Sequence, residues 1–292
     1  MFRPSDIIID AFLEHLDNRY KSQFGKNDSI YAETLTQVAR MALPRIASSN
    51  ALYHNLEHTL LCTQAGIDII RGKMIRDGDV SPKDWVNYIS SLMCFPLGFV
   101  RDCCSGDQGD TCIINRSGDT ITLPRGANDG ALWVHFFERS KIFIHEHFEN
   151  HPVLDEKVLI DNINHTEFPP PPKGKESTHD YPGLTRAAQV IGVVGDPKFM
   201  NKVKPLFLEL QESGLASEMG YKKVSDIRES YPRAFWSIFH PLLQDAISYL
   251  KYTAEGLTWL ANMHAHMLIE EHRKPAPEVV TPLPTNRNLR SK

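Results

Sequence analysis

Apolar residues recur at helical spacing along most of the chain. Positions three and four residues apart share one helix face, as at Ile7, Ile8, Phe12 and Leu16, and at Leu35, Val38, Ala39 and Ala42. Pro44 is expected to close the second of these helices. Ser81-Pro82-Lys83-Asp84 predicts a further helix start, because Ser81 can cap it, Pro82 suits the first turn and Asp84 offsets the helix dipole.

The helical pattern is interrupted between residues 103 and 129. Four glycines punctuate this stretch, and the short β-type runs at 113–114 and 120–123 predict a long irregular loop with a small hairpin. Helices are expected to resume near Ala131, and another is expected to start at Pro152. The prolines at 169–172 predict an extended connector. Later helices are expected to begin at Pro197, Pro205, Pro232 and Pro241.

The pattern as a whole predicts an all-α fold. We expect about ten helices in a single domain over residues 1–272, because no flexible linker divides the apolar pattern. The irregular loop at 103–129 lies within this domain. Prolines and polar residues over 273–292 predict a disordered tail.

Composition narrows the possible partners. The 292 residues are 41% hydrophobic and 23% charged, with a net charge of -4, which argues against a nucleic-acid partner. The most apolar stretch, Ile89–Val100, is too short to cross a bilayer and contains Pro96, so no membrane partner is expected. Five cysteines without disulfide-scaffold spacing indicate a reducing cytoplasm. The pair Cys103-Cys104 is interpreted as reduced loop thiols, in preference to a redox or metal pair.

The candidate chemistry centres on two histidines. His54 and His58 are four residues apart, so a helix would place them side by side on one face. Such a pair can form half of a metal site, or an acid beside a metal ligand. It can equally be structural, because two histidines at this spacing are common.

The residues around the pair favour a functional role over a structural one. Tyr53-His54-Asn55-Leu56-Glu57-His58 reads Y-H-N-x-x-H, which resembles the signature of the HD superfamily, in its cyclic-nucleotide-phosphodiesterase-like branch of metal-dependent phosphohydrolases. The resemblance runs from about Tyr53 to about Tyr252 and includes Tyr181-Pro182-Gly183-Leu184-Thr185-Arg186-Ala187-Ala188. It implies an HD-type helical fold, with His54 as general acid and His58 as a metal ligand.

The sequence departs from that family at its metal ligands. Active relatives carry a His-Asp dipeptide in a pattern like L-x-C-H-D-I-G-Y, where this chain has Phe95-Pro96. Relatives also carry an aspartate after R-A-A, where this chain has Gln189. A phenyl ring and a proline ring offer a divalent cation no donor atom, and glutamine offers one neutral carbonyl oxygen. On this alignment only His58 survives of the metal ligands, and His54 is a relic acid.

Other residues are candidates for the same region. Tyr53, Asn55 and Asp102 are expected at the pocket, with Asp102 on or just beyond the helix that carries Phe95. His179-Asp180 is a literal His-Asp pair, but its loop context beside Pro182 favours a structural role.

Three functions remain open. The first is a degenerate HD-domain protein that acts as a non-catalytic binding or regulatory module for a small molecule or a protein partner, with no cofactor. The second is an active phosphohydrolase or phosphodiesterase with a migrated site for manganese, magnesium, iron or zinc, which rests on family analogy alone. The third is a helical partner-docking protein that uses the 103–129 loop and the proline connector as its surface.

Overall fold

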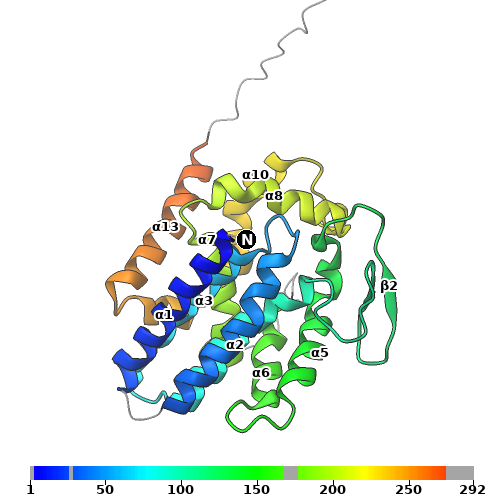
Figure 1. Cartoon of the computed structure of the whole chain (residues 1–292). Coiled ribbons are helices and arrows are strands. Elements are labelled where there is room, and N and C mark those ends of the chain that lie inside the picture. The colour runs from blue at the N-terminus through cyan, green and yellow to red at the C-terminus, as the bar shows by residue number, and fades with distance from the viewer. Residues whose placement is uncertain (1–2, 26–28, 168–176, 274–292) are drawn as a thin grey trace, which may run out of the picture.

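Local capping signals set where the helices of the first half begin and end. The computed structural model describes residues 3–25, 29–167 and 177–273, shown in Figure 1. The first four helices are α1 (Pro4–Phe24), α2 (Ser29–Ser48), α3 (Leu56–Asp77) and α4 (Pro82–Cys94). Asn55 caps α3 by accepting from the backbone N–H of His58, and Gly78 ends that helix in the left-handed conformation. Ser81 and Asp84 form a capping box at α4, as the sequence predicts.

The middle of the chain changes from helix to loop and back. A 3-10 turn, η1 (Phe95–Phe99), follows α4 directly. Strands β1 (Thr111–Ile113) and β2 (Thr120–Thr122) then pair antiparallel, with Cys112 opposite Ile121. This confirms the predicted hairpin within the loop. Helical structure resumes in the 3-10 segment η2 (Asp129–His135), followed by α5 (Phe136–Phe148), α6 (Glu156–Ile163) and the 3-10 turn η3 (Asn164–Thr166).

The last third of the chain consists of shorter helices. These are α7 (Tyr181–Val194), α8 (Phe199–Glu212), α9 (Leu215–Glu218), α10 (Val224–Ala234), the π-helical turn η4 (Phe235–Phe239), α11 (His240–Leu242), α12 (Gln244–Leu250) and α13 (Ala254–Glu271). Buried apolar side chains from every helix between α1 and α13 except α11 form one large cluster. The fold is all-α apart from the hairpin, which confirms the predicted class. The described residues hold more α-helices than the roughly ten expected, and two of them, α9 and α11, are single short turns.

Several expected helix boundaries are wrong at prolines. Pro44 lies inside α2, Pro205 inside α8 and Pro232 inside α10. Each proline removes one backbone donor, but buried neighbours such as Leu43 hold the helix on both sides. The helix expected at Pro152 starts instead at Glu156, because Asp155 caps it by accepting from two backbone N–H groups.

Two expected segments are not part of this description. The proline connector at 169–172 and the tail from 274 lie outside the described residues. Among the helices that are described, none combines the length and the apolar character needed to span a bilayer.

The irregular loop is tied to the helical body by one buried arginine. Arg139 on α5 is 0% exposed and forms a bidentate ion pair with Asp107, with both Nη–Oδ distances at 2.9 Å. Its guanidinium also donates to the carbonyl oxygens of Gly98, Val100 and Ile113. Burial alone would raise the pKa of Asp107, but the hydrogen bonds and the charge of Arg139 lower it below its ordinary value. The pair therefore fixes both ends of the segment from 98 to 113.

Helices α3 and α7 cross in close contact, and a glycine makes this possible. A methyl group at Gly192 would lie 2.7 Å from Cα and 2.8 Å from the backbone nitrogen of Cys62. Because α3 carries His58 and α7 carries Gln189, this crossing sets the spacing between two walls of the site described below.

Gly192→Ala is expected to lower the free energy of unfolding by about 1–3 kcal/mol, the usual cost of overpacking. The added methyl would meet backbone atoms of Cys62, so the two helices must move apart. Urea unfolding measures this loss of stability. The loss should remain when Cys62→Ala is present as well, because the added methyl meets the backbone of residue 62. An unchanged or higher stability would contradict this explanation, since alanine is the better helix former.

A buried carboxyl group lies among α1, α3 and α13. Asp68 is 1% exposed, and its Oδ2 accepts from Nε2 of Gln64 at 3.0 Å and from Nε1 of Trp259 at 2.9 Å. Burial raises the pKa of Asp68; the two hydrogen bonds and the charge of Arg19 oppose this shift, and Glu255 adds to it.

Asp68→Asn is expected to become more stable relative to the natural protein as the pH rises. A carboxyl whose folded pKa exceeds its unfolded value of about 3.9 contributes most below that value, and the contribution falls as the pH rises through the folded pKa. Urea unfolding between acidic and neutral pH measures the difference. The Asp161→Asn variant, at an exposed position of α6, is the control for replacing an aspartate elsewhere. A stability difference for Asp68→Asn that does not change with pH would refute the expectation.

Candidate functional site

His54 lies in the turn before α3 and is held by a glutamate from α8. Nδ1 of His54 is 2.6 Å from Oε2 of Glu209, and the backbone N–H groups of Tyr53 and His54 donate to Oε1 at 2.6 and 3.2 Å. Burial alone would raise the pKa of Glu209, but the charge and hydrogen bond of His54 and the two backbone donors lower it. An ionised carboxylate can only accept, so Nδ1–H of His54 donates the hydrogen bond to Glu209 and Nε2 is the ring nitrogen left for other contacts.

Aromatic rings surround this imidazole. The ring of His54 stacks on Phe99 with centroids 4.1 Å apart, and Trp133 meets it edge-on at 4.4 Å. The His58 ring lies 4.9 Å away, also edge-on. The two histidines are therefore adjacent, as expected, but only His58 is in the helix, because Asn55 caps α3 between them.

His58 is buried and has little polar contact. Its Nε2 lies 3.6 Å from Sγ of Cys62, and its ring centroid is 6.3 Å from that of Phe95. Burial, then the proximity of His54 and Lys202, lowers the pKa of His58 well below its ordinary value. The imidazole is consequently neutral at neutral pH.

The residues around His58 do not fit a divalent metal. Within the described ranges, the one group of three or more His, Cys, Asp or Glu ligand atoms lying within 4.8 Å of one another is Cys103, Cys104 and Asp107, on the irregular loop. His58 therefore has no pair of strong donors beside it, whereas a catalytic zinc needs three protein ligands. At the loop cluster, both carboxylate oxygens of Asp107 already bind Arg139.

The structure places the three residues that the HD resemblance aligns with metal ligands, which are Phe95, Pro96 and Gln189. Helix α4 ends at Cys94, and Phe95 and Pro96 open the 3-10 turn η1 with both side chains buried. Ser140 fastens this turn by donating to the carbonyl oxygen of Phe95 at 2.6 Å. Gln189 is half-buried on α7, where its backbone carbonyl accepts from the thiol of Cys62 at 3.6 Å.

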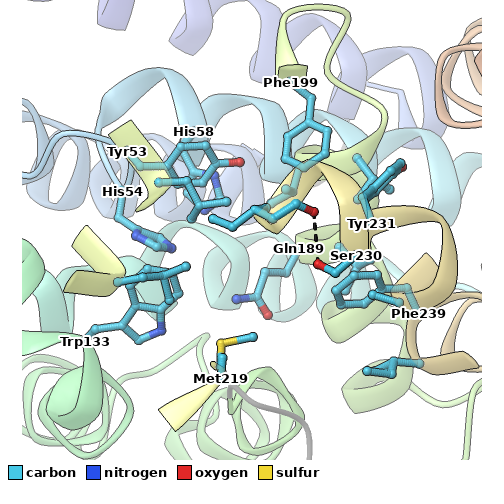
Figure 2. Close-up of a pocket in the computed structure, with 18 of the residues that line it drawn as sticks. Tyr53, His54, His58, Trp133, Gln189, Phe199, Met219, Ser230, Tyr231 and Phe239 are labelled. Carbon is cyan, nitrogen blue, oxygen red and sulfur yellow. Dashed lines mark hydrogen bonds between the residues drawn. The ribbon is translucent and has the colours of Figure 1, made fainter. Parts of the chain in front are cut away.

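A cavity of about 180 Å³ opens beside these residues (Figure 2). Most of its lining is aliphatic or aromatic and comes from α7, α8, α10 and the π-helical turn. These apolar lining residues include Trp133, Val190, Val193, Val194, Phe199, Leu206, Leu210, Met219, Ile227, Ile238, Phe239 and Leu242. The polar and charged lining residues are fewer: Tyr53, His54 and His58 lie on one side, Gln189 lies between, Ser230 and Tyr231 lie on the far side, and Glu167, Arg186 and Tyr221 complete the set.

Of the three residues expected at the pocket, one lines the cavity and two do not. Tyr53 lines the cavity, whereas Asn55 lines a separate polar pocket behind Tyr53 and His58. Asp102 is exposed, has a φ of 57° and does not line the cavity. It follows the 3-10 turn, which directs the chain away from the site. Asp180 caps α7 by accepting from the N–H of Gly183, so the literal His-Asp pair is a helix cap.

Glu209 is the site residue that sequence reasoning missed. It is separated from His54 by 155 positions, and no local pattern connects the two. The one available signal is its spacing, since Leu206 and Leu210 place a charged residue on the apolar face of α8.

The comparisons with known proteins give a family. By its fold and site, this is an all-helical protein with a mainly apolar cavity beside a buried His–Glu pair. The chain belongs to the Npun_R2479-like family, whose model matches residues 2–273. No curated protein and no solved structure matches the chain.

Proposed function

We propose that this protein is a non-catalytic binding or regulatory module, built on a degenerate HD-type helical domain, that holds a small molecule in the cavity beside His54 and His58. The resemblance in the Y-H-N-x-x-H segment supports the HD-type origin. The loss of strong donors around His58 supports the absence of metal-dependent hydrolysis.

One observation carries the proposal. Where active relatives place metal ligands, this chain buries Phe95 and Pro96, and the adjoining cavity is lined mainly by apolar side chains. Apolar cavities with a few convergent polar groups are the usual form of small-molecule sites. Binding without hydrolysis is therefore the function that this arrangement supports best.

Isothermal titration with toluene, an apolar ring that a cavity of about 180 Å³ accommodates, tests the proposal. Saturable binding to the natural protein is expected, with loss of binding in Val193→Trp, which fills the cavity from α7. Ile75→Trp, at an exposed position of α3, adds the same bulk elsewhere and should bind as the natural protein does. Unsaturable binding, or equal binding by Val193→Trp, would refute a specific site.

A second candidate function is an active metal-dependent phosphohydrolase or phosphodiesterase, and it rests on the buried His54–Glu209 pair. A carboxylate that orients an imidazole through Nδ1 is a common acid–base arrangement. The test is a panel of cyclic nucleotides and nucleotide monoesters, assayed with manganese, magnesium, iron or zinc. Turnover that is lost in His58→Ala and with chelator would establish a migrated metal site and overturn the non-catalytic proposal. Absence of turnover across the panel would count against this second candidate and support the non-catalytic proposal.

A further inference from the structure

We propose that the ligand of this cavity is a neutral, mainly hydrocarbon molecule with one hydrogen-bonding group, which binds against Tyr53 and Gln189. The inference rests on the proposed function and adds the chemical class of the ligand. It begins from two polar side chains that reach the cavity, one from the turn before α3 and one from α7.

Both side chains have polar atoms that the protein does not use. Within the described part of the chain, neither the Tyr53 hydroxyl nor the Gln189 side-chain amide forms a hydrogen bond, and Figure 2 shows both groups directed toward the cavity. Tyr53 is 6% exposed and Gln189 is half-buried, and neither of their polar groups is among the unpartnered atoms that the protein covers completely. Both groups are therefore open to the cavity, where a ligand that supplies a hydrogen-bond partner would be favoured.

The far side of the cavity offers no such free group. Ser230 donates toward the Tyr221 hydroxyl at 3.1 Å and the carbonyl of Ile227 at 3.0 Å, so these hydroxyls already have partners. The Tyr231 hydroxyl has no partner among the described residues, but its oxygen is fully covered by protein. The polar end of a ligand is therefore expected on the Tyr53 side, with its hydrocarbon part toward Ser230.

The charges around the cavity favour a neutral ligand. Glu209 is fully occupied by His54 and two backbone donors, and the neutral His58 offers no ionic partner. Arg186 and Glu167 also line the cavity, one with a positive and one with a negative charge, so together they add no net charge to its wall. Transfer of an ion into apolar surroundings without a paired charge is costly, so a neutral group is favoured over an ion.

The volume sets the size of the ligand. An apolar cavity of about 150 Å³ accommodates benzene, so the 180 Å³ found here accommodates a substituted six-membered ring. Benzyl alcohol and ethylbenzene are a matched pair of this size, because they differ by one hydroxyl in place of a methyl group. Benzylammonium and benzoate supply a positive and a negative charge on nearly the same framework.

Isothermal titration of these four compounds tests the inference. In Tyr53→Phe and in Gln189→Met, the affinity for benzyl alcohol relative to ethylbenzene should fall by roughly fivefold, the value of one hydrogen bond. Ser230→Ala, on the opposite side of the cavity, should leave this ratio unchanged. In the natural protein, benzyl alcohol should bind at least about tenfold more tightly than either ion, because the ions bear the desolvation cost.

The outcomes separate this inference from the proposed function. An unchanged ratio in both Tyr53→Phe and Gln189→Met, or tighter binding of benzoate or benzylammonium, would overturn the neutral polar contact while leaving a binding cavity. Failure of all four compounds and of toluene to bind would overturn the proposed function itself. The melting temperature of each variant establishes that it is folded. The two substitutions lie on different elements, so each tests the contact independently.

Discussion

Glu209→Leu is expected to lower the free energy of unfolding by about 3–5 kcal/mol, because three buried donors lose their acceptor at a cost of about 1–3 kcal/mol each. Glu209 is 0% exposed and accepts from His54 and from two backbone N–H groups. Leucine removes every acceptor and leaves three buried donors without partners. Urea unfolding followed by circular dichroism measures the loss.

Glu209→Gln is the graded comparison for this change. The amide oxygen can still accept from the backbone donors, so the loss should be clearly smaller than for leucine. Glu229→Leu, at an exposed position of α10, controls for removal of a glutamate and should change stability little. Equal stability of Glu209→Leu and the natural protein would show that the pair does not hold the turn before α3.

Arg139→Met is expected to cost a similar amount, about 3–5 kcal/mol, and to release the irregular loop. The substitution leaves the Asp107 carboxylate buried without its counter-charge, and three carbonyl oxygens lose their donor. Thermal unfolding measures the stability, and limited trypsin digestion measures loop release through cleavage after Arg116 and Arg125. Both measurements should change together, because the same side chain supports both.

A double variant separates the charge from the packing. Arg139→Met with Asp107→Asn should recover part of the loss, since the unpaired buried charge is gone while the asparagine oxygen can still accept from the N–H of Ile113. Arg125→Met, an exposed arginine on the same loop, should leave the stability close to that of the natural protein. An Arg139→Met protein that unfolds as the natural protein does would rule out the anchoring role.

Features that depend on neighbours in sequence could be predicted. The capping box of Ser81 and Asp84, and the end of α3 at Gly78, follow from side chains within three or four residues of the backbone groups that they satisfy. The hairpin between residues 111 and 122 is equally local. The all-α class follows from the apolar periodicity, which directly reflects which helix faces are buried.

Features that depend on distant residues could not be predicted. Pro44 reads as a helix stop, yet α2 continues to Ser48 because tertiary burial of its neighbours outweighs one lost hydrogen bond. Glu209 reads as an ordinary charged helix residue until α8 packs against the turn before α3. Asp102 was expected at the pocket, but the 3-10 turn that begins at Phe95 carries the chain to the surface.

The close crossing at Gly192 bears on how the cavity responds to occupancy. Because backbone touches backbone between α3 and α7, their separation is fixed before any ligand arrives. A guest entering between Tyr53 and Gln189 therefore meets preorganised walls, and little of its binding energy is spent on ordering them. Any adjustment to larger guests falls to the opposite rim, where the π-helical turn at Phe235–Phe239 departs from regular helix geometry.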